Sequence, residues 1–162
     1  MTERKVAKSF ADLPSKEEMT SRSGLEAMKR MLNGDAAGPP ISDHMNYTLT
    51  EVEDGRVVFS GAPLFEYCNP MGTVHGGWYG TLLDSCMACA VMSKLPVGSA
   101  YTTLEYKINI LRSIPVGMQV EAIGIAQHVG RSTGVAVGEI RGVEDGRLYA
   151  TGSTTCIVMK VA

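Results

Sequence analysis

The chain has 162 residues and a formal net charge of −2 at pH 7, with 44% hydrophobic and 20% charged residues. That length suits one domain with a sizeable core, and the small negative charge disfavours nucleic acid as a partner, because phosphate neutralisation needs a basic face. No stretch has the roughly 18 uninterrupted apolar residues of a membrane span, so no membrane partner is expected. The four cysteines come without a signal-peptide pattern, which predicts reduced thiols and a cytoplasmic location.

The first 40 residues are predicted to form an N-terminal arm with short helices. Residues 1 to about 14 are expected to be held loosely. Ser15 and Glu18 have the spacing of a capping box, which predicts a short helix after Ser15. Apolar residues at helical spacing predict a second helix over residues 23–32, which Asn33-Gly34 ends.

After a predicted linker at residues 36–40, the rest of the chain is expected to form one domain of six strands and one helix. The strands are marked by alternating or β-branched residues between glycine-containing turns. They are predicted at residues 45–53, 57–62, 101–111, 118–128, 133–141 and 148–158. Short connections favour antiparallel neighbours, so the predicted fold class is α+β, with the helix packed on one face of the sheet. The arm then covers residues 1–40 and the main domain residues 41–162.

The clearest alternation lies in the strand predicted at residues 101–111. The pattern predicts one face made of Leu104, Tyr106, Ile108 and Ile110. The opposite face is predicted to carry Thr103, Glu105, Lys107 and Asn109.

The predicted helix is almost wholly apolar and carries one acid. From Trp78 to Ser93 the only ionisable carboxylate belongs to Asp84. A helix that is apolar all round is normally buried. A carboxylate in such a helix must be paired, protonated or used for chemistry.

Two glycines, Gly76 and Gly77, stand where this helix is predicted to begin. Glycine lets a ligand approach the main chain closely, and the first N–H groups of a helix are unpaired at its positive end. A carbonyl oxygen docked there would be stabilised as an oxyanion. Asp84 lies about two turns further on, too far to reach that carbonyl, but a symmetric dimer can bring a second Asp84 to it. The alternative is an acid on an exposed stripe, with glycines that only permit tight packing.

These residues resemble the motif of the hotdog-fold acyl-CoA thioesterases, specifically of the phenylacetate-pathway (PaaI-like) branch. The motif reads Asn69-Pro70-x-Gly72-x-x-His75-Gly76-Gly77, with Asp84 nine residues after the histidine. Weaker similarity extends over residues 25–158. The resemblance implies a hotdog fold for residues 41–162, in which a curved antiparallel sheet of five to six strands wraps a long central helix.

The resemblance also implies roles for five residues. Asp84 corresponds to the catalytic acid, which attacks the thioester carbonyl or activates water. Gly76 corresponds to the residue whose backbone N–H polarises that carbonyl. Asn69 corresponds to the asparagine near the thioester or the attacking water, and His75 to the histidine that arranges the loop. Thr103 falls where such enzymes often carry a hydroxyl that positions water across the dimer.

Further residues are candidates for substrate binding. Gly77 would allow close approach of the substrate, and Arg112 and Arg131 at strand ends are candidates for the phosphates of coenzyme A. Tyr67 and Trp78 beside the loop are candidates for an acyl pocket. Solvated surface arginines and core aromatic residues are the alternatives.

No cofactor or metal is expected, because a thioester is already activated and a carboxylate with an oxyanion hole can suffice. The Cys86-x-x-Cys89 spacing has no second pair, so small packing residues explain it better than metal or redox chemistry.

The predicted function is an acyl-CoA thioesterase that hydrolyses an acyl- or aryl-acyl-CoA to the free acid and coenzyme A. It is expected to work as a homodimer or as a dimer-of-dimers homotetramer. The alternatives are a hotdog dehydratase acting on 3-hydroxyacyl thioesters and a non-catalytic acyl-CoA-binding module. The presence of Asp84 and the order of the motif favour hydrolysis.

Overall fold

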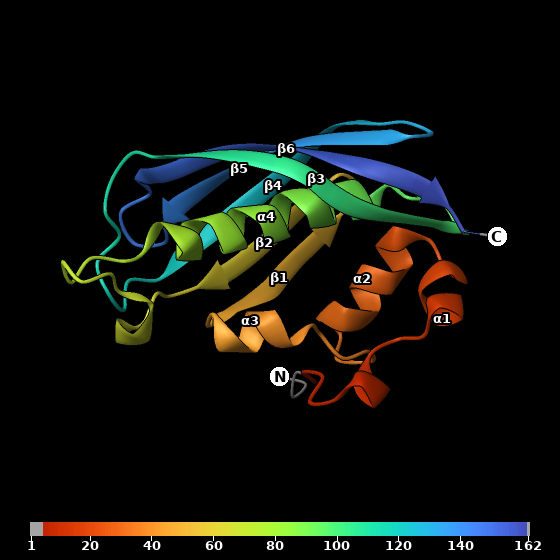
Figure 1. Ribbon diagram of the computed structural model, residues 1–162, viewed down its shortest axis with the longest axis horizontal. Coiled ribbons are helices and arrows are strands. Elements are labelled where there is room, and N and C mark those ends of the chain that lie inside the picture. The colour runs from red at the N-terminus through yellow and green to blue at the C-terminus, as the bar shows by residue number, and fades with distance from the viewer. Residues whose placement is uncertain (1–4, 162) are drawn as a thin grey trace.

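One long helix lies against a single curved sheet, which confirms the predicted α+β architecture (Figure 1). The structure is a computed structural model and describes residues 5–161. The six strands are β1 (Tyr47–Glu53), β2 (Arg56–Gly61), β3 (Ser99–Ile110), β4 (Val120–Val129), β5 (Thr133–Gly142) and β6 (Leu148–Lys160). The helices are α1 (Lys16–Thr20), α2 (Gly24–Leu32), α3 (Pro40–His44) and α4 (Gly76–Ser93), with short 3-10 turns at Phe10–Asp12 and Phe65–Tyr67.

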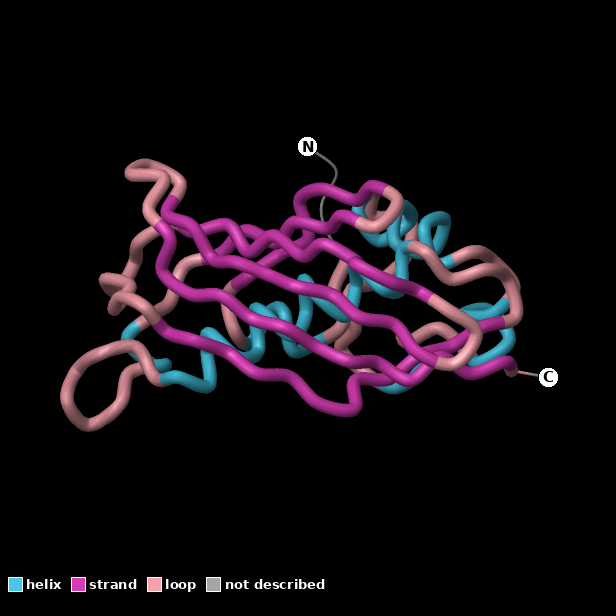
Figure 2. The backbone as a smooth tube through the Cα atoms, turned by 90° about the horizontal axis from the view of Figure 1, so that it is seen from above, coloured by secondary structure: helices cyan, strands magenta, loops and turns pink. Residues whose placement is uncertain are grey.

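The sheet is antiparallel throughout, in the order β1-β2-β4-β5-β6-β3. Short turns produce this pairing, since two antiparallel strands need only a few residues between them. Gly55 in the β1–β2 turn and Gly146 in the β5–β6 turn have positive φ angles of 83° and 63°, which glycine adopts without strain. Figure 2 shows the strands side by side across α4.

The core lies between α4 and the concave face of the sheet. Eleven of the eighteen residues of α4 are buried, so most of the helix surface is covered. The approach is closest at β4, where a Cβ on Gly124 would lie 2.1 Å from the Cys86 carbonyl oxygen of α4. The backbones of strand and helix are therefore in contact there, and only glycine fits.

The N-terminal residues are attached more closely than predicted. The helices α1 and α2 are confirmed, each with the capping box of a serine and a glutamate. Val6, however, forms a bridge with Gly38, and Ala7 is buried, so residues 5–14 are not a loose arm. The predicted linker is also wrong in part, because α3 begins at Pro40, and proline suits the first position of a helix. Residues 1–4 of the predicted arm lie outside the described residues.

Helix α2 shares its core with the rest of the molecule. Met28 is fully buried within the same apolar cluster as α4, and Gly24 N–H donates to the Leu95 carbonyl at 2.9 Å. In Figure 1, α2 lies beside β1 and α4. The division of the chain at residue 40 into an arm and a domain stays a prediction.

Strand β3 departs from the predicted alternation at Leu104. Thr103 pairs with Cys156 and Glu105 with the adjacent Thr155, so Leu104 is the extra residue of a β-bulge. The bulge reverses the alternation. Thr103 and Tyr106 therefore both contact α4, whereas Leu104 is 60% exposed. The prediction that placed Leu104 with Tyr106, opposite Thr103, was wrong for this reason.

Strands β1 and β3 form the two edges of the sheet. The β3 edge is long, and it carries exposed apolar side chains: Leu104, Tyr106 and Ile110. An exposed, apolar edge strand is suited to pairing with another chain. Among residues 5–161, no helix is long and apolar enough to cross a membrane.

Substitution of Gly124 by alanine should destabilise the fold strongly. The new methyl group would overlap the backbone of α4 at Cys86, and we expect the free energy of unfolding to fall by about 3 kcal/mol, the upper end for overpacking. Denaturant titration measures this change. Gly38→Ala is the matched control, because its Cβ would lie 3.7 Å from the nearest atom, an ordinary contact. Equal stability of the two variants would show that α4 and β4 are not packed backbone to backbone.

Candidate active site

The loop before α4 is held together by the side chain of Asn69. Its Oδ1 accepts hydrogen bonds from the N–H groups of Met71 (2.9 Å) and Thr73 (3.3 Å). Its Nδ2 donates to Thr73 Oγ1 at 2.9 Å. An amide nitrogen has two hydrogens, so one remains for a ligand. Asn69 thus stabilises the loop and keeps one amide hydrogen without a partner in it. The motif and its spacing do not indicate these loop contacts.

His75 caps the helix that follows. Its ring Nδ1 accepts a hydrogen bond from Gly77 N–H at 2.9 Å. Its backbone N–H donates to the Tyr67 carbonyl at 2.8 Å. An imidazole nitrogen that accepts carries no proton, so the hydrogen of the neutral ring lies on Nε2. His75 therefore arranges the start of α4, in the position that the motif predicted.

The Gly76 N–H is the first backbone donor of α4. Within residues 5–161 it has no hydrogen-bond acceptor, whereas the Gly77 N–H is occupied by His75. Gly76 is partly exposed, so a ligand oxygen can reach this donor. The unpaired N–H at the positive end of a helix is suited to a developing oxyanion.

Asp84 lies further along α4 and is half-buried. Its Oδ1 accepts a hydrogen bond from Thr103 Oγ1 at 3.0 Å, across from β3 of the same chain. Because of the bulge at Leu104, Thr103 before it and Tyr106 after it face α4 together. Thr103 is thus a partner of its own chain's Asp84, a contact that the predicted alternation did not contain.

The two groups of residues do not meet within one chain. Asp84 follows Gly76 by eight residues, which corresponds to about 12 Å along the helix axis. One end of α4 therefore carries the loop, the cap and the free N–H, and its middle carries the Asp84–Thr103 pair. The two groups therefore lie apart on α4.

The two arginines predicted to bind phosphate lie at opposite ends of the sheet. Arg112 follows β3 at the end near Gly76, and one of its guanidinium nitrogens donates to the Leu148 carbonyl at 2.6 Å. Arg131 is exposed in the β4–β5 turn, near the C-terminal end of α4, where Gly134 meets Val91. A single chain does not bring the two arginines together.

The two predicted aromatic residues border a small pocket at the start of α4. Tyr67 and Trp78 line a volume of about 420 Å³ together with His75, Gly77 and Thr81, among others. Trp78 is only 1% exposed, and its Nε1–H donates to the Met45 carbonyl at 2.9 Å. The Tyr67 hydroxyl donates to the His44 carbonyl at 2.6 Å. Both rings have structural contacts, and their part in substrate binding stays a prediction.

The cysteines of α4 are surrounded by apolar packing. Burial raises the pKa of the Cys86 thiol, and it raises the pKa of Cys89 to about 12, so both thiols are protonated at neutral pH. In the described part of the chain, no group of three or more His, Cys, Asp or Glu side chains is placed to hold a metal ion.

One polar pair beside the acid has no marker in the sequence. The Tyr47 hydroxyl of β1 and Ser85 Oγ of α4 lie 2.8 Å apart, next to Asp84 but on the other flank of the helix. No motif contains these residues, since their contact depends on how β1 lies against α4.

The sequence matches the thioesterase superfamily over residues 71–149. No curated protein matches it significantly. Among solved structures, a phenylacetic acid degradation-related protein of Ralstonia eutropha JMP134 is 29% identical, with a TM-score of 0.72 over 80% of this chain and 97% of the other. A hypothetical thioesterase of Streptococcus pneumoniae TIGR4, solved with coenzyme A, is 29% identical, with a TM-score of 0.65 over 72% of this chain and 88% of the other.

The PaaI protein of E. coli, at 20% identity, is similar in fold, with a TM-score of 0.72 over 88% of this chain and 99% of the other. The matched residues 71–149 contain Gly76, Asp84 and Thr103. Fold, family match and structural relatives thus agree with the resemblance that the motif carries. The chain thus has a hotdog fold and is similar to the thioesterase superfamily and to its PaaI-like members.

Proposed function

We propose that this protein is an acyl-CoA thioesterase whose sites are shared between two chains. The observation that supports it best is the separation of an unpaired Gly76 N–H from the half-buried Asp84–Thr103 pair on one helix. Each part has the chemistry of half a hydrolytic site. The S. pneumoniae relative, solved with coenzyme A, supports a CoA thioester as the substrate class.

The reaction needs two groups from the protein. The carbonyl oxygen accepts a hydrogen bond from Gly76 N–H, which stabilises the negative charge that develops on attack. Asp84 removes a proton from the attacking water, or attacks the carbonyl carbon itself to form an acyl-enzyme anhydride, which water hydrolyses after coenzyme A has left. Thr103 holds Oδ1 of this carboxylate, so Oδ2 faces the reacting groups. The tetrahedral intermediate then expels the thiolate of coenzyme A, a good leaving group because thiols ionise near pH 8.5.

A two-fold dimer through the β3 edge completes the site. Pairing of two β3 strands would cover their exposed apolar side chains and bring Asp84 of one chain toward Gly76 of the other. The same symmetry would bring Arg112 of one chain and Arg131 of its partner to one end of the sheet pair, where they can bind the phosphates of coenzyme A. Such a dimer can stand alone or pair into a tetramer.

The dehydratase alternative is less compatible with the cap. A catalytic histidine base needs a ring nitrogen that is free to accept a proton. In His75, Nδ1 is occupied by Gly77 N–H, and Nε2 carries the hydrogen. The third possibility is a binding module without catalysis. The Asp84→Asn experiment below distinguishes it from a hydrolase, because it compares hydrolysis by the wild-type protein and by the variant.

Asp84→Asn should remove hydrolysis and preserve the fold. The amide has nearly the same shape and its oxygen can still accept from Thr103, but it cannot take a proton, so we expect kcat to fall by about 10²–10⁴. Release of the free thiol from acyl-CoA measures this. Asp54→Asn is the control, because that carboxylate forms an exposed ion pair with Lys94 and should not affect turnover. Near-wild-type turnover in Asp84→Asn would remove the carboxylate from the mechanism.

Gly76→Pro should remove the oxyanion donor without breaking the helix. Proline is favoured at the first helical position, and His75 before it has φ −63° and ψ 139°, the conformation that a pre-proline residue prefers. We expect kcat to fall by about 10²–10³. Gly76→Ala keeps the N–H, and its Cβ would lie 3.5 Å from Ile110 Cδ1, an ordinary contact. If the Gly76→Pro and Gly76→Ala variants have the same activity, the oxyanion donor is a group other than the Gly76 N–H.

Leu104→Glu should separate the dimer and lower activity together. Leu104 is 60% exposed on the β3 edge, and a charge on each of two facing strands opposes their pairing. Sedimentation velocity and turnover at the same protein concentration measure both effects. Val143→Glu, at a residue that is 52% exposed in the β5–β6 turn, is the control. A monomeric Leu104→Glu variant with full activity would show that one chain contains a complete site.

A further inference from the structure

A second and larger cavity lies between the N-terminal segment and the domain. Its volume is about 920 Å³, within the usual range for small-molecule sites. Residues of α2, of β1 and of α4 form its walls, and the segment before α1 lines its outer side.

The inner walls of this cavity are apolar and flexible. Met28, Met31 and Met92 line it together with Leu49 and Phe59. Methionine side chains adapt their shape to irregular apolar ligands.

The polar groups among the inner walls are satisfied. The Tyr47 hydroxyl and Ser85 Oγ are hydrogen-bonded to each other. Burial also raises the pKa of Tyr47, so this hydroxyl stays neutral. The inner cavity therefore offers apolar contact without an unpaired charge.

The inner end of the cavity is lined by residues that are close in the chain to the proposed acid and to Thr103. Ser85 and Tyr101 both line it. Ser85 follows Asp84 in the chain, and Tyr101 precedes Thr103 by two residues on the same side of β3. A ligand whose reacting carbon lies at Asp84 thus has an apolar cavity beside it.

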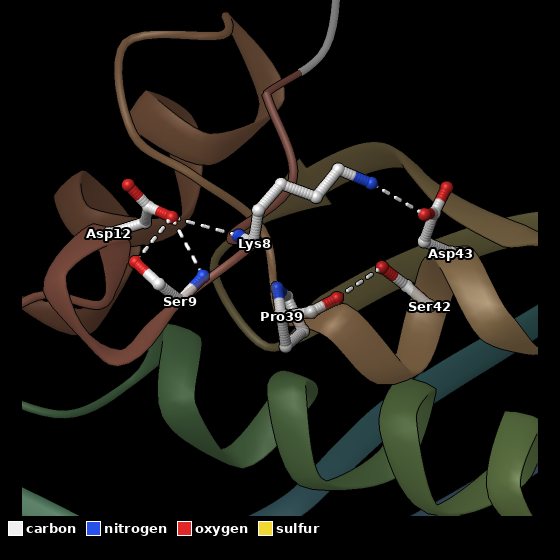
Figure 3. Close-up of polar contacts among 6 residues, drawn as sticks. All are labelled: Lys8, Ser9, Asp12, Pro39, Ser42 and Asp43. Atoms are coloured by element: carbon white, nitrogen blue, oxygen red, sulfur yellow. Dashed lines mark hydrogen bonds and ion pairs between the residues drawn. The ribbon is translucent and has the colours of Figure 1, made fainter.

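The outer end is lined by residues 5–14, here called the strap. Figure 3 shows that Lys8 Nζ donates to Asp43 Oδ2 at 2.9 Å, which attaches the strap to α3. Within the strap, the Lys8 and Ser9 N–H groups donate to Asp12 Oδ2 at 2.9 and 2.8 Å. The backbone bridge between Val6 and Gly38 completes the attachment. Charged side chains occur at this end, and they are of both signs: Lys5, Lys8, Arg22 and Arg30 with Asp12, Glu18 and Asp35.

We propose that this cavity holds the acyl chain of the substrate, and that the substrates include extended alkyl acyl groups of medium length. The inference rests on the proposed thioesterase function and names its substrate class. Coenzyme A itself does not suit the inner cavity, because its phosphates would meet methionine and aromatic walls and no cation there. Each methylene of a chain buried in the cavity should raise kcat/KM about fourfold, until the cavity is filled.

Filling the cavity should shift the preference toward short chains. Ala27 on α2 lines the cavity and is half-buried, so Ala27→Phe places a ring inside it. We expect the ratio of kcat/KM for dodecanoyl-CoA to that for butyryl-CoA to fall at least about tenfold, the equivalent of two buried methylenes. Ala27→Leu should produce a smaller shift in the same direction and serves if the phenylalanine variant does not fold. Lys29→Phe is the control, since Lys29 is exposed on the same helix and outside the cavity.

The outcomes separate this inference from the proposed function. A shift in the Ala27 variants but not in Lys29→Phe supports the acyl cavity, and an unchanged ratio in folded Ala27 variants overturns it. If the wild-type protein hydrolyses no acyl-CoA, the proposed function fails, and calorimetric binding of dodecanoate decides about the cavity. Binding that is weakened in the Ala27 variants then supports an apolar-chain site, whereas no binding, or equal binding, overturns it.

Discussion

The burial of α4 against the curved sheet is the constraint on which the rest of the structure depends. The helix can lie this close because Gly124 leaves β4 without a side chain where the Cys86 backbone passes. With most of its surface covered, the helix has few places where a functional group can reach a ligand. Those places are its first turn, with the Gly76 N–H, and the partly exposed stripe with Asp84 and Ser85.

This constraint also separates the two parts of the site. A helix keeps Gly76 and Asp84 about 12 Å apart along its axis. A hydrolytic site that uses both groups must therefore take one from each of two chains. The apolar edge of β3 is where a second chain can bring its half, and the contact between Thr103 and Asp84 lies directly inside that edge.

Much of the fold could be predicted from local patterns. The single acid in an apolar run marks α4 and its candidate residue, and alternation with glycine turns marks the six strands to within a few residues. The β-bulge at Leu104 could not be predicted, because it depends on the register of β3 against β6, distant in sequence. The attachment of Val6 to Gly38 is likewise non-local.

For the candidate site, the motif identified residues but did not indicate most of their contacts. His75 accepts a hydrogen bond from Gly77 N–H and so caps α4, while its expected part in the site stays a prediction. The spacing did not show that the Asn69 side chain forms hydrogen bonds mainly within its own loop. It also did not show that Arg112 and Arg131 lie at opposite ends of the sheet. The cavity beneath the strap arises from three separate parts of the chain, so no single stretch of sequence indicates it.

The most direct test of a site shared between chains is complementation of two inactive subunits. Asp84→Asn and Gly76→Pro chains with different tags are co-expressed, and the mixed dimers are confirmed by sequential affinity purification. Each mixed dimer contains one site with both groups intact and one without either, so the purified mixed dimers should have about half of the activity of the wild-type dimer. Mixed dimers that stay as inactive as either variant alone would contradict the shared site and place all reacting groups within one chain.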